Sequence, residues 1–212
     1  IGWSSSYTGA PFTAPEIEEY LNNYTRLVGR GASLSALEIG CGAGLVLFHL
    51  AEGMRDYVGV DLSRAATDHV REVAETIGYA HVSTRHCAAH DIASLGQGRF
   101  DRVIFASVVQ KFPSLRYLEA TLLSAIGTAA PGARIILSDI RDLETLPLFH
   151  ASVQLHRSAG GDTARELAIR TRRAIEQEAE LAIDRSYFIA LGRLSDRIKR
   201  VLVSPKRGRI PN

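Results

Sequence analysis

The sequence has few of the features that define several common classes of protein. Its two cysteines, Cys41 and Cys87, are too few for a disulfide framework and lack the spacing of metal ligands. The formal net charge is only +2, which indicates general binding neither to nucleic acid nor to a membrane surface. No apolar run is long enough to cross a bilayer, and no signal peptide is recognisable. We therefore expect a globular protein of the reducing cytoplasm, with no bound metal, no nucleic acid and no membrane as partner.

What the sequence does contain is a regular alternation of apolar runs and amphipathic segments. With 212 residues, of which 46% are hydrophobic, the chain can bury a sizeable core. Strands are predicted at residues 34–39, 56–62, 82–86, 100–106 and 133–138, and helices at residues 14–28, 45–51, 63–77 and 115–130. This alternation predicts a doubly wound, Rossmann-like α/β fold with helices on both faces of a parallel sheet.

The strongest functional signal lies between the first predicted strand of that series and the helix after it. Glu38 precedes three glycines at alternate positions, Gly40, Gly42 and Gly44. Such glycines permit a tight turn and a close approach of the backbone to a ligand. The dinucleotide fingerprint is G-x-G-x-x-G, whereas this stretch has the order E-x-G-x-G-x-G. A carboxylate at Glu38 repels a pyrophosphate but can pair with an ammonium group, so the pattern favours a ligand with an amino-acid end over NAD.

A second acid strengthens this interpretation. Asp61 ends the next predicted strand, about twenty residues after Gly40, which is the distance that places an acid on a ribose. The two features together resemble the cofactor site of class I S-adenosylmethionine (SAM)-dependent methyltransferases, whose product is S-adenosylhomocysteine (SAH). A plain strand–glycine–helix turn is the alternative. The resemblance implies a cofactor site that includes Glu38, Gly40, Cys41, Gly42, Gly44, Asp61 and Leu62.

Residues 87–92, after the third of these strands, resemble the segment that reads adenine in these methyltransferases. The Asp91 carboxylate can accept a hydrogen bond from the exocyclic amine, while a backbone N–H serves a ring nitrogen. Asp91 and Ile92 are therefore assigned to the cofactor site. The alternative is that Asp91 only forms a turn or caps a helix.

The first residues of the chain contain two aromatic side chains with polar tips, Trp3 and Tyr7. Side chains of this kind can cover a ligand and offer it a hydrogen bond, and Tyr7 could serve either the cofactor or the acceptor. We expect residues 1–30 to form an N-terminal helical lid, with a disordered terminus as the alternative. Residues 31–212 are then the SAM-binding core, with a helical insertion at about 145–182.

The C-terminal third has two further predicted elements. Residues 163–181 have helical spacing and mixed charges, which is typical of a solvated helix with ion pairs. Residues 198–203 are predicted to form a strand. The basic residues around it could dock an acidic partner such as a carrier domain or contact RNA, although a plain solubilising surface explains them equally well, and no nucleic-acid motif supports RNA.

Several strings together narrow the resemblance to the methyltransferase domains embedded in nonribosomal peptide synthetases. They are residues 3–9, 37–51, 107–114, 138–141, 149–155 and 205–208. Such domains usually interrupt an adenylation domain and methylate the α-amine of an aminoacyl group held as a thioester on a carrier (thiolation) domain. The resemblance implies both partners. Because the chain starts at Ile1 without an initiator methionine, we also expect it to be part of a longer protein.

The sequence departs from this family at two positions that flank the expected reaction crevice. Ala106 stands where an asparagine is expected, and Lys111 where an aromatic residue, typically tyrosine, is expected. Both departures leave cofactor binding intact, and Ala106 and Ser107 remain assigned to that site. They leave open which acceptor is methylated.

Methyl transfer from a sulfonium depends mainly on orientation, which can contribute on the order of 7–11 kcal/mol at best. An amine needs only to be presented in its neutral form, whereas carbon or an alcohol needs a real base. His150, in a string that resembles the family, is predicted to reach the acceptor. The alternative is that His150 is a helix residue whose ring only bonds a backbone carbonyl. Gln110 and Asp139 lie at strand ends and are candidates for holding the acceptor amine.

Three functions therefore remain open from the sequence. The first is N-methylation of a carrier-tethered aminoacyl group. The second is methylation of oxygen or carbon on a tethered or free small molecule. The third is a non-methylating relative that is structural or epimerises an α-carbon, and the intact acids and glycines of the cofactor motifs argue against it.

Overall fold

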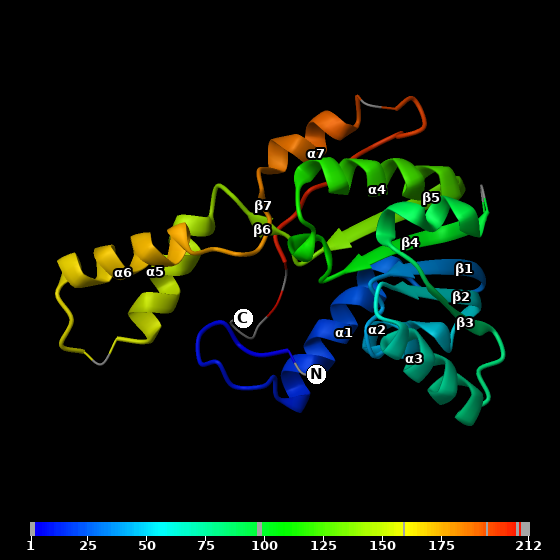
Figure 1. The fold of residues 1–212 in the computed structure, drawn as a ribbon, viewed down its shortest axis with the longest axis horizontal. Coiled ribbons are helices and arrows are strands. Elements are labelled where there is room, and N and C mark those ends of the chain that lie inside the picture. Colours follow the sequence, from blue (N-terminus) through cyan, green and yellow to red (C-terminus); the bar gives the residue numbers. More distant parts are fainter. Residues whose placement is uncertain (1–2, 97–98, 159, 194, 207, 209–212) are drawn as a thin grey trace. The chain divides into compact units, whose positions relative to one another are not determined.

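A computed structural model describes residues 3–96, 99–158, 160–193, 195–206 and 208 of the chain (Figure 1). The chain divides into two compact units, which are described separately. The sheet unit consists of Glu18–Asp139, and the helical unit consists of Ile1–Ile17 together with Ile140–Asn212. No helix within the described ranges combines the length and the apolar character needed to cross a bilayer.

The sheet unit is built on five parallel strands in the order β3-β2-β1-β4-β5. Their bounds are β1 (Gly31–Ile39), β2 (Met54–Asp61), β3 (Val82–His86), β4 (Phe100–Ala106) and β5 (Ala129–Ser138). The central strands are apolar along most of their length because both faces of the sheet are covered. The strand order reverses between β1 and β4, and ligands of open α/β sheets bind beyond the carboxyl ends of the strands at such a point.

Helices cover both faces of this sheet, as predicted. In Figure 1, α1 (Ala14–Val28), α2 (Leu45–Ala51) and α3 (Arg64–Thr76) lie on one face, and α4 (Leu115–Thr128) lies on the other. The short 3-10 helix η1 (Ala89–Leu95) packs against α4. This distribution follows from right-handed crossovers that run outward from β1 in both directions.

Local sequence signals set several of the element boundaries. Ser63 caps α3 by accepting a hydrogen bond from the N–H of Ala66, and Ser114 caps α4 by accepting one from Tyr117. Residues 131–132, which precede the predicted strand 133–138, lie inside β5. The register along β4 shifts there, so that Gly132, with a φ of 81°, lies in a bulge.

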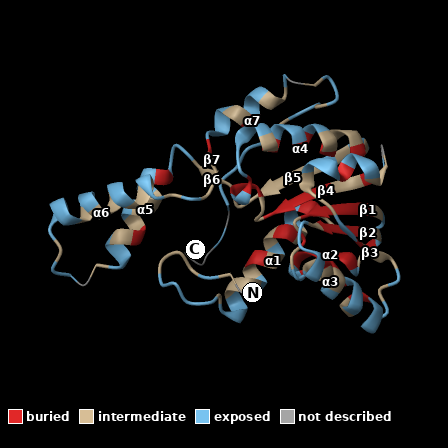
Figure 2. Ribbon diagram, in the orientation of Figure 1, coloured by how far each residue is buried: buried red, intermediate tan, exposed pale blue. Residues whose placement is uncertain are grey.

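The core of the molecule lies between the sheet and its helices. Figure 2 shows the buried residues on the strands and on the helix faces turned toward them. Among the large side chains that are fully buried are Leu37, Leu47, Ile104 and Phe105. The sheet is therefore a rigid base for the loops that leave its carboxyl edge.

The helical unit is less buried. Its two-residue strands β6 (Arg141–Asp142) and β7 (Ala182–Ile183) pair in parallel, and α7 (Arg185–Leu191) follows β7. The helices α5 (Leu146–His156) and α6 (Ala164–Glu176) pack together as a hairpin at the place of the predicted insertion. A capping box between Thr163 and Glu166 starts α6, which has no buried residue.

Two expectations need correction. Residues 198–203 are not a strand, because none of the described residues in this segment pairs with another strand, and Leu202 is exposed. A β-prone run becomes a strand only where a neighbour accepts its backbone hydrogen bonds. The division of the chain also differs from the predicted boundary at residue 30, because the sheet unit begins at Glu18 and includes the buried Tyr20 and Tyr24 of α1.

Candidate functional site

The glycine turn between β1 and α2 has the backbone that the sequence predicts. Gly40, Gly42 and Gly44 have φ values of 74°, 52° and 84°, a region that favours glycine. A Cβ atom on Gly40 would lie 2.5 Å from Cγ2 of Val108, and one on Gly44 would lie 2.7 Å from Cε2 of Phe48. At Gly42 nothing lies within 4 Å of such an atom. Side chains therefore pack closely against the turn at Gly40 and Gly44, whereas the space beside Gly42 is open.

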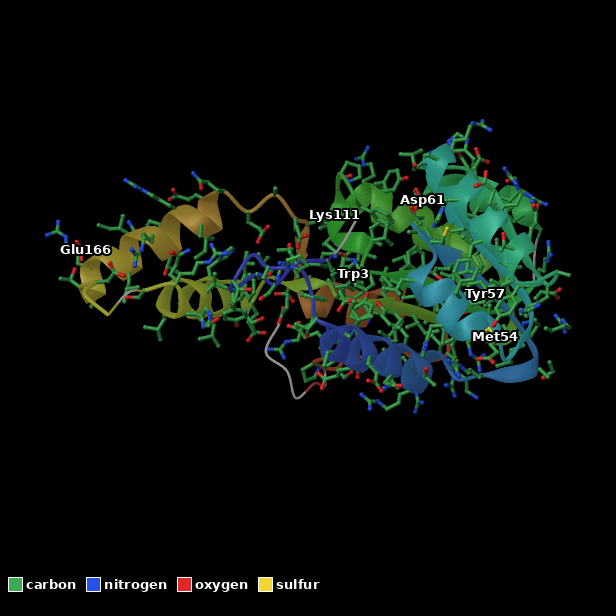
Figure 3. The ribbon with its side chains drawn as sticks, turned by 90° about the horizontal axis from the view of Figure 1, so that it is seen from below. Trp3, Met54, Tyr57, Asp61, Lys111 and Glu166 are labelled. Carbon is green, nitrogen blue, oxygen red and sulfur yellow. The ribbon has the colours of Figure 1, made fainter. Side chains whose placement is uncertain are left out.

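Asp61 connects this turn to the next helix. Its Oδ2 accepts a hydrogen bond from the N–H of Gly42 at 2.9 Å, and its Oδ1 accepts one from the N–H of Ser63 at 2.8 Å. Figure 3 labels this carboxylate at the end of β2. The side chain of the next residue, Leu62, is 72% exposed. An oriented carboxylate thus stands beside an exposed apolar surface.

We expected the Glu38 carboxylate to be open to a ligand, but it is buried. It is 2% exposed, and its Oε2 accepts a hydrogen bond from the hydroxyl of Tyr57 at 2.7 Å. Burial, helped by the negative charge of Asp61, raises the pKa of Glu38 from 4.5 to about 8, although the hydrogen bond opposes the shift. Within the described ranges Glu38 forms no salt bridge. A buried carboxyl of this kind is suited to a cation from outside the chain.

Cys41 also lies beneath the turn rather than on its surface. A Cβ atom on Gly59 would lie 2.9 Å from the Cys41 Sγ and 2.7 Å from Cδ1 of Leu47, which explains a glycine inside β2. Burial raises the pKa of the Cys41 thiol, so the thiol stays protonated. Its side chain supports the turn by packing.

The segment predicted to read adenine forms η1. Ile92 is fully buried and anchors η1, whereas the Asp91 side chain is exposed, with one carboxylate oxygen 3.4 Å from Nε2 of His90. Asp91 does not cap a helix, because the N-cap position of η1 is held by Ala88. The exposed carboxylate therefore remains accessible to a ligand.

Two residues at the carboxyl ends of β4 and β5 have an unusual backbone. Ser107 and Asp139 have φ values of 50° and 58°, and they are the non-glycine residues of the described chain with positive φ. Their preceding residues, Ala106 and Ser138, are paired in the sheet, so the two side chains emerge next to each other. The Ser107 Oγ donates a hydrogen bond to Asp139 Oδ2 at 2.6 Å. Strain of this kind is concentrated at functional sites.

Helix α1 completes a cluster around Asp139. Tyr24 donates to Asp139 Oδ2 at 2.9 Å, Ser138 donates to the same oxygen at 3.1 Å, and the hydroxyls of Tyr24 and Ser138 also contact each other. The Tyr20 hydroxyl lies 2.7 Å from Ser107 Oγ. We call these five residues, Tyr20, Tyr24, Ser107, Ser138 and Asp139, the hydroxyl cluster.

The two tyrosines of the hydroxyl cluster were not predicted. Burial and the charge of Asp139 raise the pKa of Tyr20 and of Tyr24, so both phenols remain hydrogen-bond donors. Their spacing of four residues on the buried face of an amphipathic helix is a signal that the sequence does contain. A polar aromatic residue on such a face needs a partner, and the partner here is Asp139.

Gln110 has a buried acceptor atom without a partner. It lies in the 3-10 turn η2 (Val109–Lys111) and is 8% exposed. In the described part of the chain, its Oε1 accepts no hydrogen bond. An unsatisfied buried group costs about 1–3 kcal/mol, which a donor on a ligand would recover. Ala106 is buried at the end of β4, and Lys111 is exposed.

His150 belongs to the helical unit. Its Nε2 lies 3.1 Å from Oε2 of Glu178, and both side chains are largely buried, so its partner is a carboxylate rather than a backbone carbonyl. A carboxylate of this kind fixes the orientation of an imidazole ring. Glu178 was not among the predicted site residues.

The two N-terminal aromatic residues also lie in the helical unit. Tyr7 contacts the rings of Phe149 and His156, and its hydroxyl lies 3.0 Å from Ser152 Oγ. Trp3 packs against Phe12. These contacts give the described residues from 3 onward a defined structure on α5, so the alternative of a disordered terminus is wrong for them. A role in covering a ligand stays a prediction.

Comparison with known proteins identifies the family. The family described as "Methyltransferase domain" matches residues 31–186. The chain belongs to this family. Its match includes the glycine turn, Asp61 and both strand ends of the hydroxyl cluster. The predicted class, a SAM-dependent methyltransferase with SAM as cofactor, is thereby confirmed.

Relatives of known name are large synthetases. The chain is 36% identical over 208 residues to the chondramide synthase of Chondromyces crocatus, which covers 98% of this chain and 5% of that protein. It is 37% identical over 182 residues to a probable non-canonical nonribosomal peptide synthetase of Salinispora arenicola, covering 86% of this chain and 2% of that protein. The chain thus spans a small part of these relatives, which agrees with the resemblance to embedded methyltransferase domains.

Solved structures confirm the fold. A putative methyltransferase of Bacillus halodurans superposes with a TM-score of 0.61 at 15% identity, covering 82% of this chain and 67% of that one. The N-methyltransferase NodS of Bradyrhizobium japonicum, solved with SAH, gives a TM-score of 0.50 at 22% identity, covering 65% and 66%. At these identities the likeness concerns the fold alone, and it confirms the predicted α/β class.

Proposed function

We propose that this chain transfers a methyl group from SAM to the α-amine of an aminoacyl group held as a thioester on a carrier domain. The observation that carries the choice of nitrogen is the unpartnered Oε1 of buried Gln110. Gln110 follows β4, and Asp139 follows the neighbouring strand β5. Both groups accept hydrogen bonds, so they suit an acceptor group that carries N–H donors.

The sheet unit offers groups that fit each part of SAM. The open backbone beside Gly42 would lie against the cofactor, Asp61 would accept hydrogen bonds from the ribose hydroxyls, and Leu62 with Asp91 would contact the adenine. The buried Glu38 lacks a cation in the described chain, and the ammonium group of SAM would supply one. When bound, SAM supplies an activated methyl: the N–C bond forms, the C–S bond breaks, and the electron pair stays on sulfur.

The residues near the acceptor have to present a neutral amine and receive a proton afterwards. Methylation leaves the nitrogen with a positive charge, and the proton that it loses can pass to the Asp139 carboxylate. The buried Tyr20 and Tyr24 cannot accept it, because they already hold their protons. A carboxylate is a weak base, which is sufficient for an amine but not for a carbon acid or an alcohol.

Two further roles rest on the resemblance to synthetase domains. His150, oriented by Glu178, is the second candidate to accept the proton. The carrier domain and a flanking adenylation domain are the proposed partners, because the named relatives are synthetases many times longer than this chain. With two free cysteines, the proposed compartment is the reducing cytoplasm.

The test is an incubation with SAM and a set of acceptors. The acceptors are an aminoacyl carrier, the same amino acid free in solution, and a carrier loaded with the corresponding hydroxy acid. We expect SAH to form with the aminoacyl carrier, and fragmentation to locate the methyl on nitrogen. A methyl on oxygen or carbon would contradict the proposal, and so would an absence of SAH from a chain that binds SAM.

A further inference from the structure

The hydroxyl cluster contains more groups than a simple amine anchor requires. We propose that Tyr24, Ser107 and Tyr20 are positioning residues. They hold the Asp139 carboxylate charged and in a fixed orientation toward the acceptor nitrogen. This inference rests on the proposed function for its catalytic consequence. Its structural part, the effect of the hydroxyls on Asp139, can be tested without any acceptor.

The three hydroxyls that contact Asp139 directly all donate to the same oxygen atom. Tyr24, Ser107 and Ser138 all donate to Asp139 Oδ2, at 2.9, 2.6 and 3.1 Å. Hydrogen bonds to one carboxylate oxygen stabilise its charged form, because only the anion accepts all of them well. Since Ser107 uses its proton on Asp139, the Tyr20 hydroxyl, 2.7 Å away, donates to Ser107.

The backbone around the cluster supports this arrangement. Ser107 and Asp139 both occupy the left-handed region, and they follow paired residues of β4 and β5. This region is uncommon for residues other than glycine. The left-handed turns bring the two side chains together at the carboxyl edge of the sheet, next to the strand-order reversal where ligands bind.

Two titratable groups of the described sheet unit that act on Asp139 are Tyr20 and Tyr24, both from α1. Tyr24 is also close enough to Tyr57 for its charge to act on the pKa of Tyr57. The pKa of each of the three phenols is raised by burial. The two phenols of the cluster therefore keep their protons over the range of pH in which a carboxyl titrates.

Tyr57 provides a matched control for Tyr24. Both are buried tyrosines that donate to a carboxylate, Tyr57 to Glu38 at 2.7 Å and Tyr24 to Asp139 at 2.9 Å. Replacing either by phenylalanine removes one hydroxyl from the same interior. A general loss of packing would affect the two variants alike, whereas a positioning role predicts that only the Tyr24 variant changes Asp139.

The experiment measures the titration of the Asp139 carboxyl by carbon-13 NMR in the 212-residue chain, with Asp139→Asn to assign the signal. We expect Tyr24→Phe to raise its midpoint by about one pH unit, and Tyr57→Phe to leave it in place. Ser107→Ala, which removes a second donor without touching an aromatic ring, should raise it as well and serves if Tyr24→Phe does not fold. An unchanged midpoint in Tyr24→Phe and Ser107→Ala would overturn the inference, as would equal shifts in the Tyr24 and Tyr57 variants.

The catalytic consequence is measured on the same variants with an aminoacyl carrier. Tyr24→Phe should lower kcat about tenfold and move the acidic limb of its pH profile to higher pH, with the Kd for SAH unchanged. A wild type that binds SAH but does not methylate the amine would refute the proposed function and leave the NMR result standing. A wild type that methylates, combined with an unmoved pH profile in Tyr24→Phe, would refute the positioning role alone.

Discussion

The sheet unit contains two pairs in which a buried tyrosine donates a hydrogen bond to a carboxylate, and the surroundings of the two carboxylates differ. Glu38 receives a hydroxyl from Tyr57 and lies 2% exposed beneath the glycine turn, where burial raises its pKa to about 8. Asp139 receives hydroxyls from Tyr24, Ser107 and Ser138 at the edge of the sheet. Burial dominates at Glu38, which is suited to a cation from the cofactor, whereas three donors converge on Asp139 and, as we propose, hold it charged.

The largest expected effect is the loss of kcat when Asp139 is replaced. Asp139→Asn keeps the shape but removes the charge and the proton acceptor, so kcat should fall about 100-fold or more. Calorimetry should find the affinity for SAH within about twofold of the wild type. Asp101→Asn is the control. Asp101 also accepts a hydrogen bond from a serine, Ser35, but it lies near the start of β4, away from the carboxyl ends of the strands. Equal losses of kcat in both variants would refute a special role for Asp139.

The next effect concerns the cofactor side. Asp61→Ala removes the hydrogen bonds to the N–H groups of Gly42 and Ser63 and the expected contacts with the ribose. The affinity for SAH, measured by calorimetry, should fall about 10- to 100-fold, because hydrogen bonds to a charged group contribute about 1.5–3 kcal/mol. Affinity equal to that of the wild type would mean that the ribose lies elsewhere.

Glu38 should make cofactor binding and stability depend on pH in opposite ways. The folded protein keeps a proton on Glu38 up to about pH 8, whereas the unfolded chain loses it near 4.5, so the free energy of unfolding should fall as pH rises between these values. The affinity for SAH should rise with pH from about 6 to 7.5, by up to about tenfold per unit, because pairing with the ammonium requires the charged carboxylate.

The measurements for Glu38 are Tm without ligand and calorimetry with SAH across that range of pH. Glu38→Gln is the matched variant, since its neutral amide does not titrate. It should flatten both profiles and bind SAH more weakly above pH 7. Profiles with the same slope in the wild type and in Glu38→Gln would assign the pH dependence to another group.

The smallest expected effect is the loss of SAH affinity when Tyr57 is replaced. Tyr57→Phe leaves Glu38 without its donor, which should raise the pKa of Glu38 further. At pH 7 the affinity for SAH should fall about three- to tenfold, because more of the carboxyl is then protonated in the free protein. The loss should shrink as the pH is raised. A loss that is constant with pH would indicate a packing defect instead.

Much of the fold could be predicted because its signals are local. The bounds of β3 and β4 and the Ser63 cap follow from short apolar runs and one hydroxyl. The glycine turn is equally readable, since positive φ at Gly40 and Gly44 leaves the sequence few other choices. In both cases a few neighbouring residues determine the conformation.

The features that the sequence did not reveal depend on contacts between distant segments. Nothing near Ser107 or Asp139 signals a left-handed backbone, and Tyr24 is 115 residues from its carboxylate partner. The burial of Glu38 likewise depends on Tyr57 of the neighbouring strand. Residues 198–203 failed as a strand for a related reason, because their apolar pattern is local but the pairing partner that a strand needs is not.

The most direct measurement is tandem mass spectrometry of an aminoacyl carrier after one turnover with carbon-13-labelled SAM. We expect one labelled methyl on the α-nitrogen for the wild type, matched by one SAH, and almost none for Asp139→Asn in the same time. A labelled oxygen or carbon would contradict the proposed N-methylation, and full labelling by Asp139→Asn would contradict the role of Asp139.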